Sequence, residues 1–357
     1  SVNVLANDTS PAGLPLSVDP DLVYTPSPVG TPFVTGNLVR LEAGTSPGTL
    51  QVAYSVHDSS GNLATSTVTF EVIASDQANN APQPQALTAW AVTGETTRIP
   101  VPLNGTDPDG DSVSLVGVAQ SPTKGTVELG TGWLEYTPAR DTTGTDVFTY
   151  TVRDRLGKTA TATVRVGVAS SSAVNTPPVA VDDLVVAQPG RTVAVDVLAN
   201  DLDADGDRLS LQGAPVAEDP ALEVSSRANQ VLVTLPSSEG VYSLRYTVSD
   251  SRGGTAVGTV TLQVSSDAPR AHPVGVDDYV TVDQVDASGQ VTVPVLDNDR
   301  DKDGSPWSLT LSTEEPDVQV VDKSLRLSVS QEPRTVLYTV TDADGLTGHA
   351  VVVVPAL

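Results

Sequence analysis

The densest group of side chains able to do chemistry is the stretch Asn200–Asp207, which reads Asn-Asp-Leu-Asp-Ala-Asp-Gly-Asp. Its four carboxylates, Asp201, Asp203, Asp205 and Asp207, occupy alternate positions, and a glycine precedes the last of them. Like charges at this spacing repel one another unless a cation lies among them or water surrounds each of them. Alternating carboxylates on a glycine-tightened loop are how proteins wrap about six to eight oxygen ligands around Ca²⁺. The stretch therefore predicts a calcium loop, with a solvated acidic turn as the alternative, because Asp and Gly also favour turns.

The acidic loop recurs upstream and downstream, and a shortened copy at Asn7–Gly13 has lost its later acids. The other loop acids are Asp107, Asp109, Asp111, Asp299, Asp301 and Asp303. An EF-hand does not fit these loops. It requires a carboxylate at the twelfth position of its loop, where counting from Asp201 gives Gln212, and it requires helices on both sides, where this chain has strand patterns.

A second motif, Tyr-x-Val-x-Asp, repeats in step with the acidic loops. It begins at Tyr54, Tyr150, Tyr246 and Tyr338, so that its copies lie roughly a hundred residues apart, a common length for one domain. Two motifs with one period predict four tandem domains, in which each tyrosine is a buried strand residue. Short Pro-rich linkers divide the chain into residues 1–78, 79–174, 175–268 and 269–357, called repeats 1 to 4 below. Repeat 1 is expected to lack its N-terminal strand.

Each repeat is predicted to be all-β. Thr192–Leu198 and Tyr242–Ser249 alternate apolar and polar residues, which is the period of a half-buried strand. Short strands of this kind, divided by Gly- and Pro-rich turns and without a helical period, are typical of a seven-stranded Greek-key β-sandwich of the immunoglobulin type. Because Pro-rich linkers favour semi-rigid spacers, we expect four Ig-like sandwiches in a linear array.

The topology of such a sandwich gathers the acidic residues at one pole of each repeat, next to the preceding repeat. The acidic loop, the loop after the Tyr-x-Val-x-Asp strand and the start of the first strand all lie there. In repeat 3, this predicts one group formed by the four loop acids with Asp182, Asp183 and Asp250. The complete set of predicted Ca²⁺ ligands is Asp182, Asp183, Asp201, Asp203, Asp205, Asp207, Asp250, Asp277, Asp278, Asp299, Asp301, Asp303, Asp342, Asp107, Asp109, Asp111 and Asp154.

The junctions between repeats are expected to be unequal. In repeat 4, Ser305 replaces the fourth loop acid. In repeat 2, Ala86 and Leu87 replace the paired acids of the entering strand, and Gly105 replaces the first loop acid. We expect the junction between repeats 1 and 2 to bend most and to lose metal first, because no entering-strand carboxylate ties the linker to the loop. Repeat 1, with Thr9–Ala12 in its loop, is expected to hold no calcium.

The composition restricts the classes of partner. The net charge is −25, with 19 Lys+Arg against 44 Asp+Glu, which argues against nucleic acid and anionic membranes. The chain has no cysteine, so disulfides and thiolate metal sites are excluded. Bound calcium can stabilise small domains in place of disulfides. No apolar stretch is long enough to span a bilayer, so no membrane insertion is expected. Because the chain has neither an initiating Met nor a signal peptide, we expect it to be a segment of a longer protein, with further domains as neighbours.

The sequence Val195–Leu211, followed by Tyr246–Ala256, resembles the bacterial cadherin-like and Ig-like tandem repeats of large surface proteins and adhesins. Tyr136–Tyr150 in repeat 2 is similar to the same family, and the resemblance extends over all four repeats. It implies extracellular, calcium-stabilised domains that act as spacers or carry adhesive contacts.

These observations favour a non-enzymatic stalk. The sequence contains no recurring nucleophile–base pair or cofactor motif, and its three histidines have no His or Cys partner at metal-binding spacing. The alternatives are a module that binds a cell-surface glycan or protein, and an accessory region of a secreted hydrolase. A binding repeat would expose an aromatic patch, and repeat 2 holds two of the three tryptophans, Trp90 and Trp133.

Overall fold

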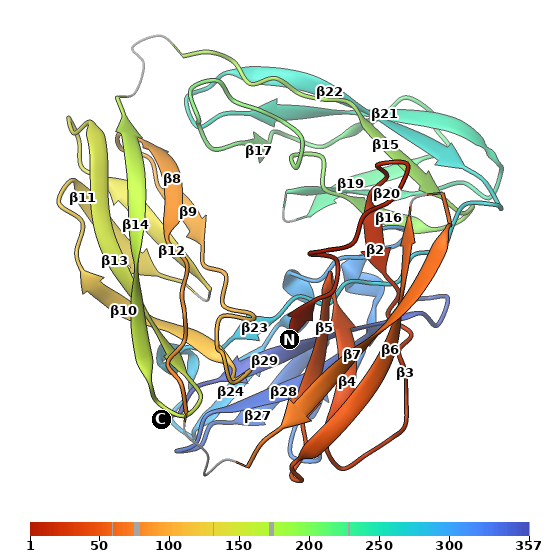
Figure 1. The fold of residues 1–357 in the computed structure, drawn as a ribbon. Helices are drawn as coiled ribbons and strands as arrows, with labels where there is room; N and C mark the ends of the chain where they lie inside the picture. Colours follow the sequence, from red (N-terminus) through yellow and green to blue (C-terminus); the bar gives the residue numbers. More distant parts are fainter. Residues whose placement is uncertain (59, 75–78, 131, 171–174, 228, 357) are drawn as a thin grey trace.

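The computed structural model describes residues 1–58, 60–74, 79–130, 132–170, 175–227 and 229–356. Within these residues the regular structure is 29 strands and three short 3-10 helices. The strands form four sandwiches, β1–β7, β8–β14, β15–β22 and β23–β29, one for each repeat (Figure 1). The predicted all-β class with tandem Ig-like sandwiches is confirmed. The 3-10 helices, all in repeat 4, are elements that the sequence did not indicate.

Repeats 1 and 2 each pair their described strands into two sheets. The strands of repeat 1 are β1 (Val2–Asn3), β2 (Leu16–Val18), β3 (Val23–Tyr24), β4 (Gly30–Thr35), β5 (Leu38–Ala43), β6 (Gly48–Asp58) and β7 (Leu63–Val72). Those of repeat 2 are β8 (Leu87–Val92), β9 (Thr97–Pro100), β10 (Val113–Gln120), β11 (Gly125–Leu129), β12 (Trp133–Pro138), β13 (Gly144–Asp154) and β14 (Thr159–Ala169). In repeat 2, the order β10-β13-β14-β8 faces the order β11-β12-β9, and β8 pairs in parallel with β14.

Repeats 3 and 4 have the same two-sheet plan. The strands of repeat 3 are β15 (Asp183–Ala187), β16 (Thr192–Val195), β17 (Ser210–Leu211), β18 (Val216–Ala217), β19 (Glu223–Arg227), β20 (Gln230–Thr234), β21 (Gly240–Ser249) and β22 (Thr255–Val264). Those of repeat 4 are β23 (Asp278–Tyr279), β24 (Gln290–Val293), β25 (Thr310–Ser312), β26 (Gln319–Val321), β27 (Ser324–Ser328), β28 (Arg334–Thr341) and β29 (Thr347–Val354). The 3-10 helices are η1 (Val282–Gln284), η2 (Val295–Asp297) and η3 (Pro306–Ser308). Repeat 3 has one strand more than the predicted seven, because two short segments, β17 and β18, both pair with β21.

Each repeat builds its core from the alternating strands that the sequence indicates. In β21, Leu244, Tyr246 and Val248 are buried, while the residues between them are half-buried or exposed. They pack against the buried residues of the facing sheet, such as Val231 and Val233 of β20. The motif tyrosines of all four repeats are buried, as predicted. Since β21 ends next to the acidic pole, the packing of its core face fixes the direction in which Asp250 enters that pole.

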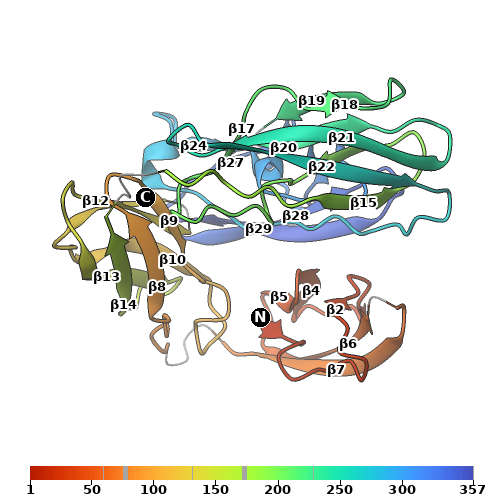
Figure 2. The ribbon, with the colours of Figure 1, turned by 90° about the horizontal axis from the view of Figure 1, so that it is seen from above.

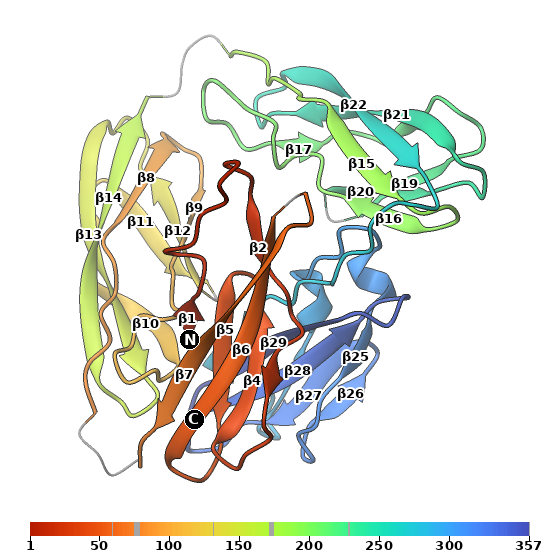
Figure 3. The ribbon, with the colours of Figure 1, turned by 45° about the vertical axis from the view of Figure 1, so that its right-hand side comes forward.

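The four sandwiches do not form the linear array that we expected, because the chain folds back and brings repeat 1 against repeat 4. Strand β4 lies beside β29 (Figures 1 and 2), and the Thr35 hydroxyl donates to the His349 carbonyl at 2.9 Å. Figure 3 shows repeat 2 on one side of this pair and repeat 3 above it. We expected a linear array because the linkers are short and Pro-rich. Contacts between residues far apart in sequence fold the chain back in spite of these linkers.

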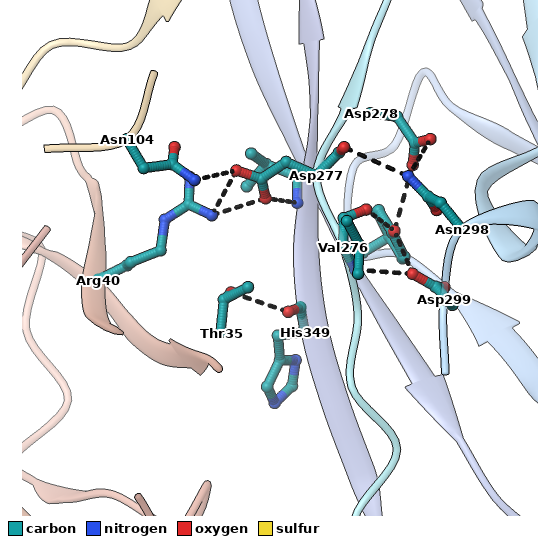
Figure 4. A network of polar contacts seen from close by, with 11 residues as sticks. Thr35, Arg40, Asn104, Val276, Asp277, Asp278, Asn298, Asp299 and His349 are labelled. Atoms are coloured by element: carbon teal, nitrogen blue, oxygen red, sulfur yellow. Dashed lines mark hydrogen bonds and ion pairs between the residues drawn. The ribbon is translucent and has the colours of Figure 1, made fainter. Parts of the chain in front are cut away.

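Charged and aromatic groups hold the contact between repeats 1 and 4 (Figure 4). The Arg40 guanidinium donates to both oxygens of Asp277, at 2.6 and 2.8 Å, and lies 5.1 Å from the ring centre of Phe33. Asn104 of repeat 2 adds a hydrogen bond of 3.0 Å to Asp277. Both hydrogen bonds come from Nη1, and the Arg40 and Asp277 side chains are only 13% and 5% exposed, so this is a buried, charge-assisted ion pair rather than a loose surface contact.

Candidate metal centres at the junctions between repeats

The acidic loop of repeat 3 is wrapped around the carboxylate of Asp203. Oδ1 of Asp203 accepts the backbone N–H groups of Asp205 at 2.8 Å and Asp207 at 3.1 Å. Gly206 lies between them with φ of 78°, a left-handed conformation that glycine adopts without strain. The bonds leave Oδ2 of Asp203 and both carboxylate oxygens of Asp207 buried and without a hydrogen-bond partner. The sequence pattern of alternating acids therefore produces a turn whose interior has unsatisfied oxygen atoms.

Asp250, at the end of β21, brings a third carboxylate to the same place. Its Oδ1 accepts the N–H groups of Arg252 at 2.8 Å and Gly254 at 2.7 Å. Its Oδ2 accepts a hydrogen bond of 2.8 Å from Nδ2 of Asn175. Asn175 is a linker residue, and its own Oδ1 is buried without a hydrogen-bond partner. The linker is further attached by the Thr176 N–H, which donates to Oδ2 of Asp205 at 2.6 Å. Linker, loop and strand end thus surround one set of unsatisfied oxygens.

The carboxylate oxygens of Asp203, Asp207 and Asp250 lie within 4.8 Å of one another. Burial, followed by the charges of Glu95 and Asp203, raises the pKa of Asp207 to about 6. Nη1 of Arg252 lies 3.8 Å from Oδ2 of Asp207 and compensates part of this charge. Burying three carboxylates this close together remains unfavourable unless a further cation compensates the rest. The donors are all carboxylate oxygens, which Ca²⁺ prefers and which Zn²⁺ and other softer metals prefer less. These residues therefore fit a calcium ion.

Not all of the predicted ligands of repeat 3 join this group. Asp201 lies deeper, where its Oδ1 accepts from the Tyr246 hydroxyl at 3.0 Å and from the Val181 N–H at 2.8 Å. Burial and the charge of Asp201 raise the pKa of the neighbouring Asp183 to about 6. Asp182 accepts the N–H of Thr259 on β22 at 2.9 Å. The single cluster expected from the sequence is thus divided into the group of Asp203, Asp207 and Asp250, an inner pair of Asp201 and Asp183, and Asp182 outside both, while Asp205 binds the linker.

Repeat 4 has the same buried pair, in which the Tyr338 hydroxyl lies 3.1 Å from Asp299 and 3.2 Å from Asp278 (Figure 4 shows these two acids). Burial, with the Asp299 charge, raises the pKa of Asp278 to about 8, and burial raises the pKa of Asp299 to about 7. Asp277, the counterpart of Asp182, accepts the Val351 N–H at 3.1 Å in addition to its ion pair with Arg40. Its carboxylate is thus held by Arg40 and the backbone of β29.

The outer acids of repeat 4, Asp301, Asp303 and Asp342, are at most 9% exposed, and each has one buried oxygen without a hydrogen-bond partner. Burial and the Asp303 charge raise the pKa of Asp301 to about 7. A guanidinium from repeat 3 lies beside them, since Nη1 of Arg191 is 2.9 Å from Oδ2 of Asp303. Within the described part of repeat 4, no three of these acids bring oxygens as close together as those of repeat 3.

Repeat 2 reproduces the arrangement of repeat 3 with fewer acids. Oδ1 of Asp107 accepts the N–H groups of Asp109 at 2.8 Å and Asp111 at 3.3 Å, and its Oδ2 is buried without a partner. Oδ2 of Asp154 accepts from the linker residue Asn79 at 2.9 Å, and Oδ1 of Asn79 is likewise unpartnered. Burial and the Asp107 charge raise the pKa of Asp111. Nδ2 of Asn80 donates to Oδ1 of Asp109 at 2.8 Å. The linker is therefore tied to the loop and to the strand end here as well, by asparagines rather than by entering-strand acids.

In repeat 1, the carboxylate of Asp58 accepts hydrogen bonds from residues of the same repeat. Oδ1 of Asp58 accepts the N–H groups of Ser60 at 2.9 Å and Asn62 at 3.0 Å, and Oδ2 accepts from the Asn62 side chain at 2.9 Å and the Ser10 hydroxyl at 3.4 Å. These hydrogen bonds lower the pKa of Asp58. The pole of repeat 1 therefore differs in kind from the other three.

The linker asparagines Asn79 and Asn175 are candidate ligands that the sequence reasoning missed. They occupy the same position in repeats 2 and 3, 75 residues before Asp154 and Asp250, so the alignment of repeats could have revealed them. Glu95, which acts on Asp207 from repeat 2, could not have been found this way. Its role depends on how two repeats dock.

A separate group with metal-ligating side chains, Asp19, Asp21 and His272, lies between repeats 1 and 4. Nδ1 of His272 is 2.9 Å from the Thr347 carbonyl, and one nitrogen of this ring lies within 4.8 Å of carboxylate oxygens of both acids. Asp21 is exposed and the other two residues are half-buried. Among the described residues, no helix has the length and apolar character needed to cross a membrane.

A fold of four tandem Ig-like sandwiches with oxygen-rich poles places the chain among multidomain β-sandwich proteins. The chain belongs to the bacterial Ig domain family, whose model matches residues 79–167, 175–263 and 266–355. These matches are repeats 2 to 4. None of the curated proteins compared matches the chain.

Solved structures with similar folds include cadherin ectodomains. Human desmocollin-1 is 14% identical, over 95% of this chain and 71% of that one, with a TM-score of 0.21. A Drosophila N-cadherin segment is 11% identical over 95% and 91%, with a TM-score of 0.24. An endo-fucoidan hydrolase from glycoside hydrolase family 107 is 18% identical over 78% of this chain, and the match spans only 45% of the enzyme, with a TM-score of 0.25. At TM-scores this low, the function of this chain has to be argued from its own residues.

Proposed function

We propose that the chain is a non-enzymatic, calcium-binding spacer from the extracellular part of a bacterial surface protein. Calcium ions bound at the junctions of repeats 1 and 2 and of repeats 2 and 3 fix the angles at which these sandwiches meet. Bacterial Ig domains are typical of such proteins, and the acidic composition suits a chain that binds cations.

The observation that carries this proposal is the set of buried oxygens without hydrogen-bond partners at the pole of repeat 3. Oδ2 of Asp203, both oxygens of Asp207 and Oδ1 of Asn175 all lack a partner there. Asn175 comes from the linker and Asp203 and Asp207 from the loop, so an ion bound to both would connect repeat 2 to repeat 3. The equivalent atoms of repeat 2, Oδ2 of Asp107 and Oδ1 of Asn79, support a second site at the junction with repeat 1.

Scanning calorimetry on the full chain tests the proposal. Calcium modules outside cells bind with a Kd of about 10⁻⁴–10⁻³ M. At about 10 mM calcium, which is roughly 10–100 times Kd, ligand linkage stabilises the repeat that holds the ion by about 1.4–2.7 kcal/mol. We expect the melting temperature to rise with calcium and to return to its starting value in chelator. Identical melts in both conditions, with no metal retained after dialysis, would refute the proposal.

The absence of enzymatic activity is part of the same proposal. The carboxylates that could act as an acid–base pair lie at the junctions, where linker and loop backbone surround them. Assays with glycoside, ester and peptide substrates are expected to give no turnover that a point mutation removes.

One observation favours a second function, the binding of a glycan by repeat 2. Trp90 on β8 is 81% exposed. Its ring lies against Gly167 of β14, where an added Cβ would come within 2.7 Å of the ring. The indole is thus held beside β14 and still presents most of its surface to solvent, where it could stack on a sugar ring. Retardation of the chain in gels containing soluble xylan or β-glucan, and its loss in Trp90→Ala, tests this; equal mobility of the two proteins would exclude it.

A further inference from the structure

Arg191 is the charged side chain of repeat 3 that contacts the acidic pole of repeat 4. Nη1 of Arg191, in the turn between β15 and β16, lies 2.9 Å from Oδ2 of Asp303, and Nη2 pairs with Oδ2 of Asp344. Gln188 accepts from the same guanidinium at 3.1 Å and helps to orient it. The Arg191 side chain is 16% exposed, and those of Asp303 and Asp344 are 4% and 13% exposed. The ion pairs are therefore enclosed between the two repeats.

A backbone hydrogen bond accompanies the arginine. Strand β16 is at the edge of its sheet, and the Ala194 N–H donates to the Gly304 carbonyl of repeat 4 at 2.8 Å. The acidic loop of repeat 4 thus covers an open sheet edge of repeat 3, and the exchange of this one amide reports directly on docking.

The junction between repeats 2 and 3 has the opposite charge at the equivalent position. Gly94-Glu95-Thr96 in repeat 2 corresponds to Gly190-Arg191-Thr192 in repeat 3. Oε1 of Glu95 accepts from the Ser251 hydroxyl of repeat 3 at 2.6 Å, and its charge contributes to the raised pKa of Asp207. The preceding repeat therefore adds a carboxylate to the pole of repeat 3, but a guanidinium to the pole of repeat 4.

Three further positions of the pole differ between the two repeats. The linker asparagine of repeat 3, Asn175, is replaced in repeat 4 by Arg270, whose Nε lies 3.6 Å from Oδ1 of Asp344. Asp344 itself stands where repeat 3 has Arg252, and Ser305 stands where repeat 3 has Asp207. Two oxygen-bearing side chains at the pole of repeat 3, those of Glu95 and Asn175, thus correspond to arginines at the pole of repeat 4. An arginine cannot ligate a metal, and it repels a cation electrostatically.

We propose that the junction between repeats 3 and 4 is closed by arginines of the chain, with Arg191 as the fixed cation, and that it stays docked when calcium is removed. The inference rests on the proposed function only for the contrast that it draws with the junction between repeats 2 and 3, where a calcium ion holds the linker. The reversed charges also make the two junctions non-interchangeable, because Glu95 would meet Asp344 in a wrong pairing of repeats 2 and 4.

Amide hydrogen exchange in the full chain tests this, measured with calcium and with chelator. Two amides report on the two junctions: Thr176, which donates to Asp205, and Ala194, which donates to Gly304. We expect chelator to lower the protection of Thr176 by about tenfold or more and to leave that of Ala194 within about twofold. Loss of Ala194 protection in chelator as large as that of Thr176 would overturn the proposal. If chelator leaves the protection of Thr176 unchanged, the calcium site of repeat 3 is refuted. The protection of Ala194 in the arginine variants still tests the role of Arg191 in that case.

Variants separate the arginine from general stability. Arg191→Glu is expected to lower Ala194 protection by about tenfold or more with or without calcium, and the control Arg245→Glu, on an exposed pair with Glu218, leaves it unchanged. The exchanged pair Arg191→Asp with Asp344→Arg is expected to restore it. The protection of the core amide of Leu244 shows whether repeat 3 is still folded. If Arg191→Glu lowers the protection of Leu244 as well, the proposal is judged from the exchanged pair alone. Full protection of Ala194 in Arg191→Glu, or none in a folded exchanged pair, contradicts the proposal.

Discussion

Replacing Tyr246 by phenylalanine should destabilise repeat 3 by about 2–3 kcal/mol. Tyr246 is 2% exposed, and its hydroxyl lies 3.0 Å from Oδ1 of Asp201, 3.1 Å from the Val181 carbonyl and 3.3 Å from the Val197 carbonyl. The substitution keeps the ring in the core and removes only the donor. Oδ1 of Asp201 then keeps the Val181 N–H as its remaining hydrogen bond.

The magnitude follows from the burial and charge of the acceptor. Leaving a buried polar partner unsatisfied costs about 1–3 kcal/mol, and a charged partner lies at the upper end of this range. In a domain of roughly 100 residues, each kcal/mol lowers the melting temperature by about 4–8 °C. The transition of repeat 3 should therefore move down by about 8–24 °C.

Calorimetry on the full chain in calcium measures this shift, and two other tyrosines calibrate it. Tyr242→Phe removes a hydroxyl that is bonded to exposed Ser238, so we expect less than about 0.5 kcal/mol. Tyr150→Phe removes one hydrogen bond of 2.6 Å to the Gln85 carbonyl in repeat 2, with no carboxylate beside it, so we expect about 1 kcal/mol. Equal shifts for Tyr246→Phe and Tyr242→Phe would refute the idea that the hydroxyl anchors the acidic pole.

Further predictions concern pH and the docking of repeat 1. Burial raises the pKa of Asp278 to about 8 and that of Asp299 to about 7, so the folded state binds more protons than the unfolded state above about pH 4. In chelator, the free energy of unfolding of repeat 4 should fall as the pH rises from about 4 to 8. A pH-independent melt, or an unaltered pH slope in Asp278→Asn, would contradict this. Arg40→Ala leaves buried Asp277 without its cation, so small-angle scattering should show a larger radius of gyration for this variant. The control Arg98→Ala, which removes an exposed ion pair, should keep the radius of the original chain. Equal radii for the two variants would show that the Arg40–Asp277 pair does not hold repeat 1 against repeat 4.

The sequence predicted the local parts of the candidate site because they depend on spacing within one repeat. The alternation of Asp203 and Asp207, and a strand that ends at Asp250, were enough to predict that these three carboxylates converge. The same reasoning placed Asp182 and Asp277 in the site, but each accepts a backbone N–H of the adjacent strand instead, at 2.9 and 3.1 Å. Two acids in succession on a strand point to opposite faces, so only one of each pair can face the loop.

Contacts between repeats were beyond sequence reasoning. Arg40 and Asp277 are separated by 237 residues, and no motif marks either of them as an interface residue. The fold-back of repeat 1 on repeat 4 brings these two residues together, while the linkers alone indicated a rod. Glu95 and Arg191 are similar cases, since their opposite charges acquire meaning only once the next repeat is docked against them.

The most direct test of the account is a calcium titration of the metal-free full chain by isothermal calorimetry, beside Asp207→Asn and the exposed control Asp267→Asn. The account predicts binding with a Kd of about 10⁻⁴–10⁻³ M. It also predicts that Asp207→Asn abolishes the contribution of repeat 3, because both buried oxygens of Asp207 lack any other hydrogen-bonding partner. Asp267→Asn should titrate like the original chain, since its side chain lies on the surface. A chain that takes up no calcium, or an Asp207→Asn variant that binds as many ions as tightly as the original, would contradict it.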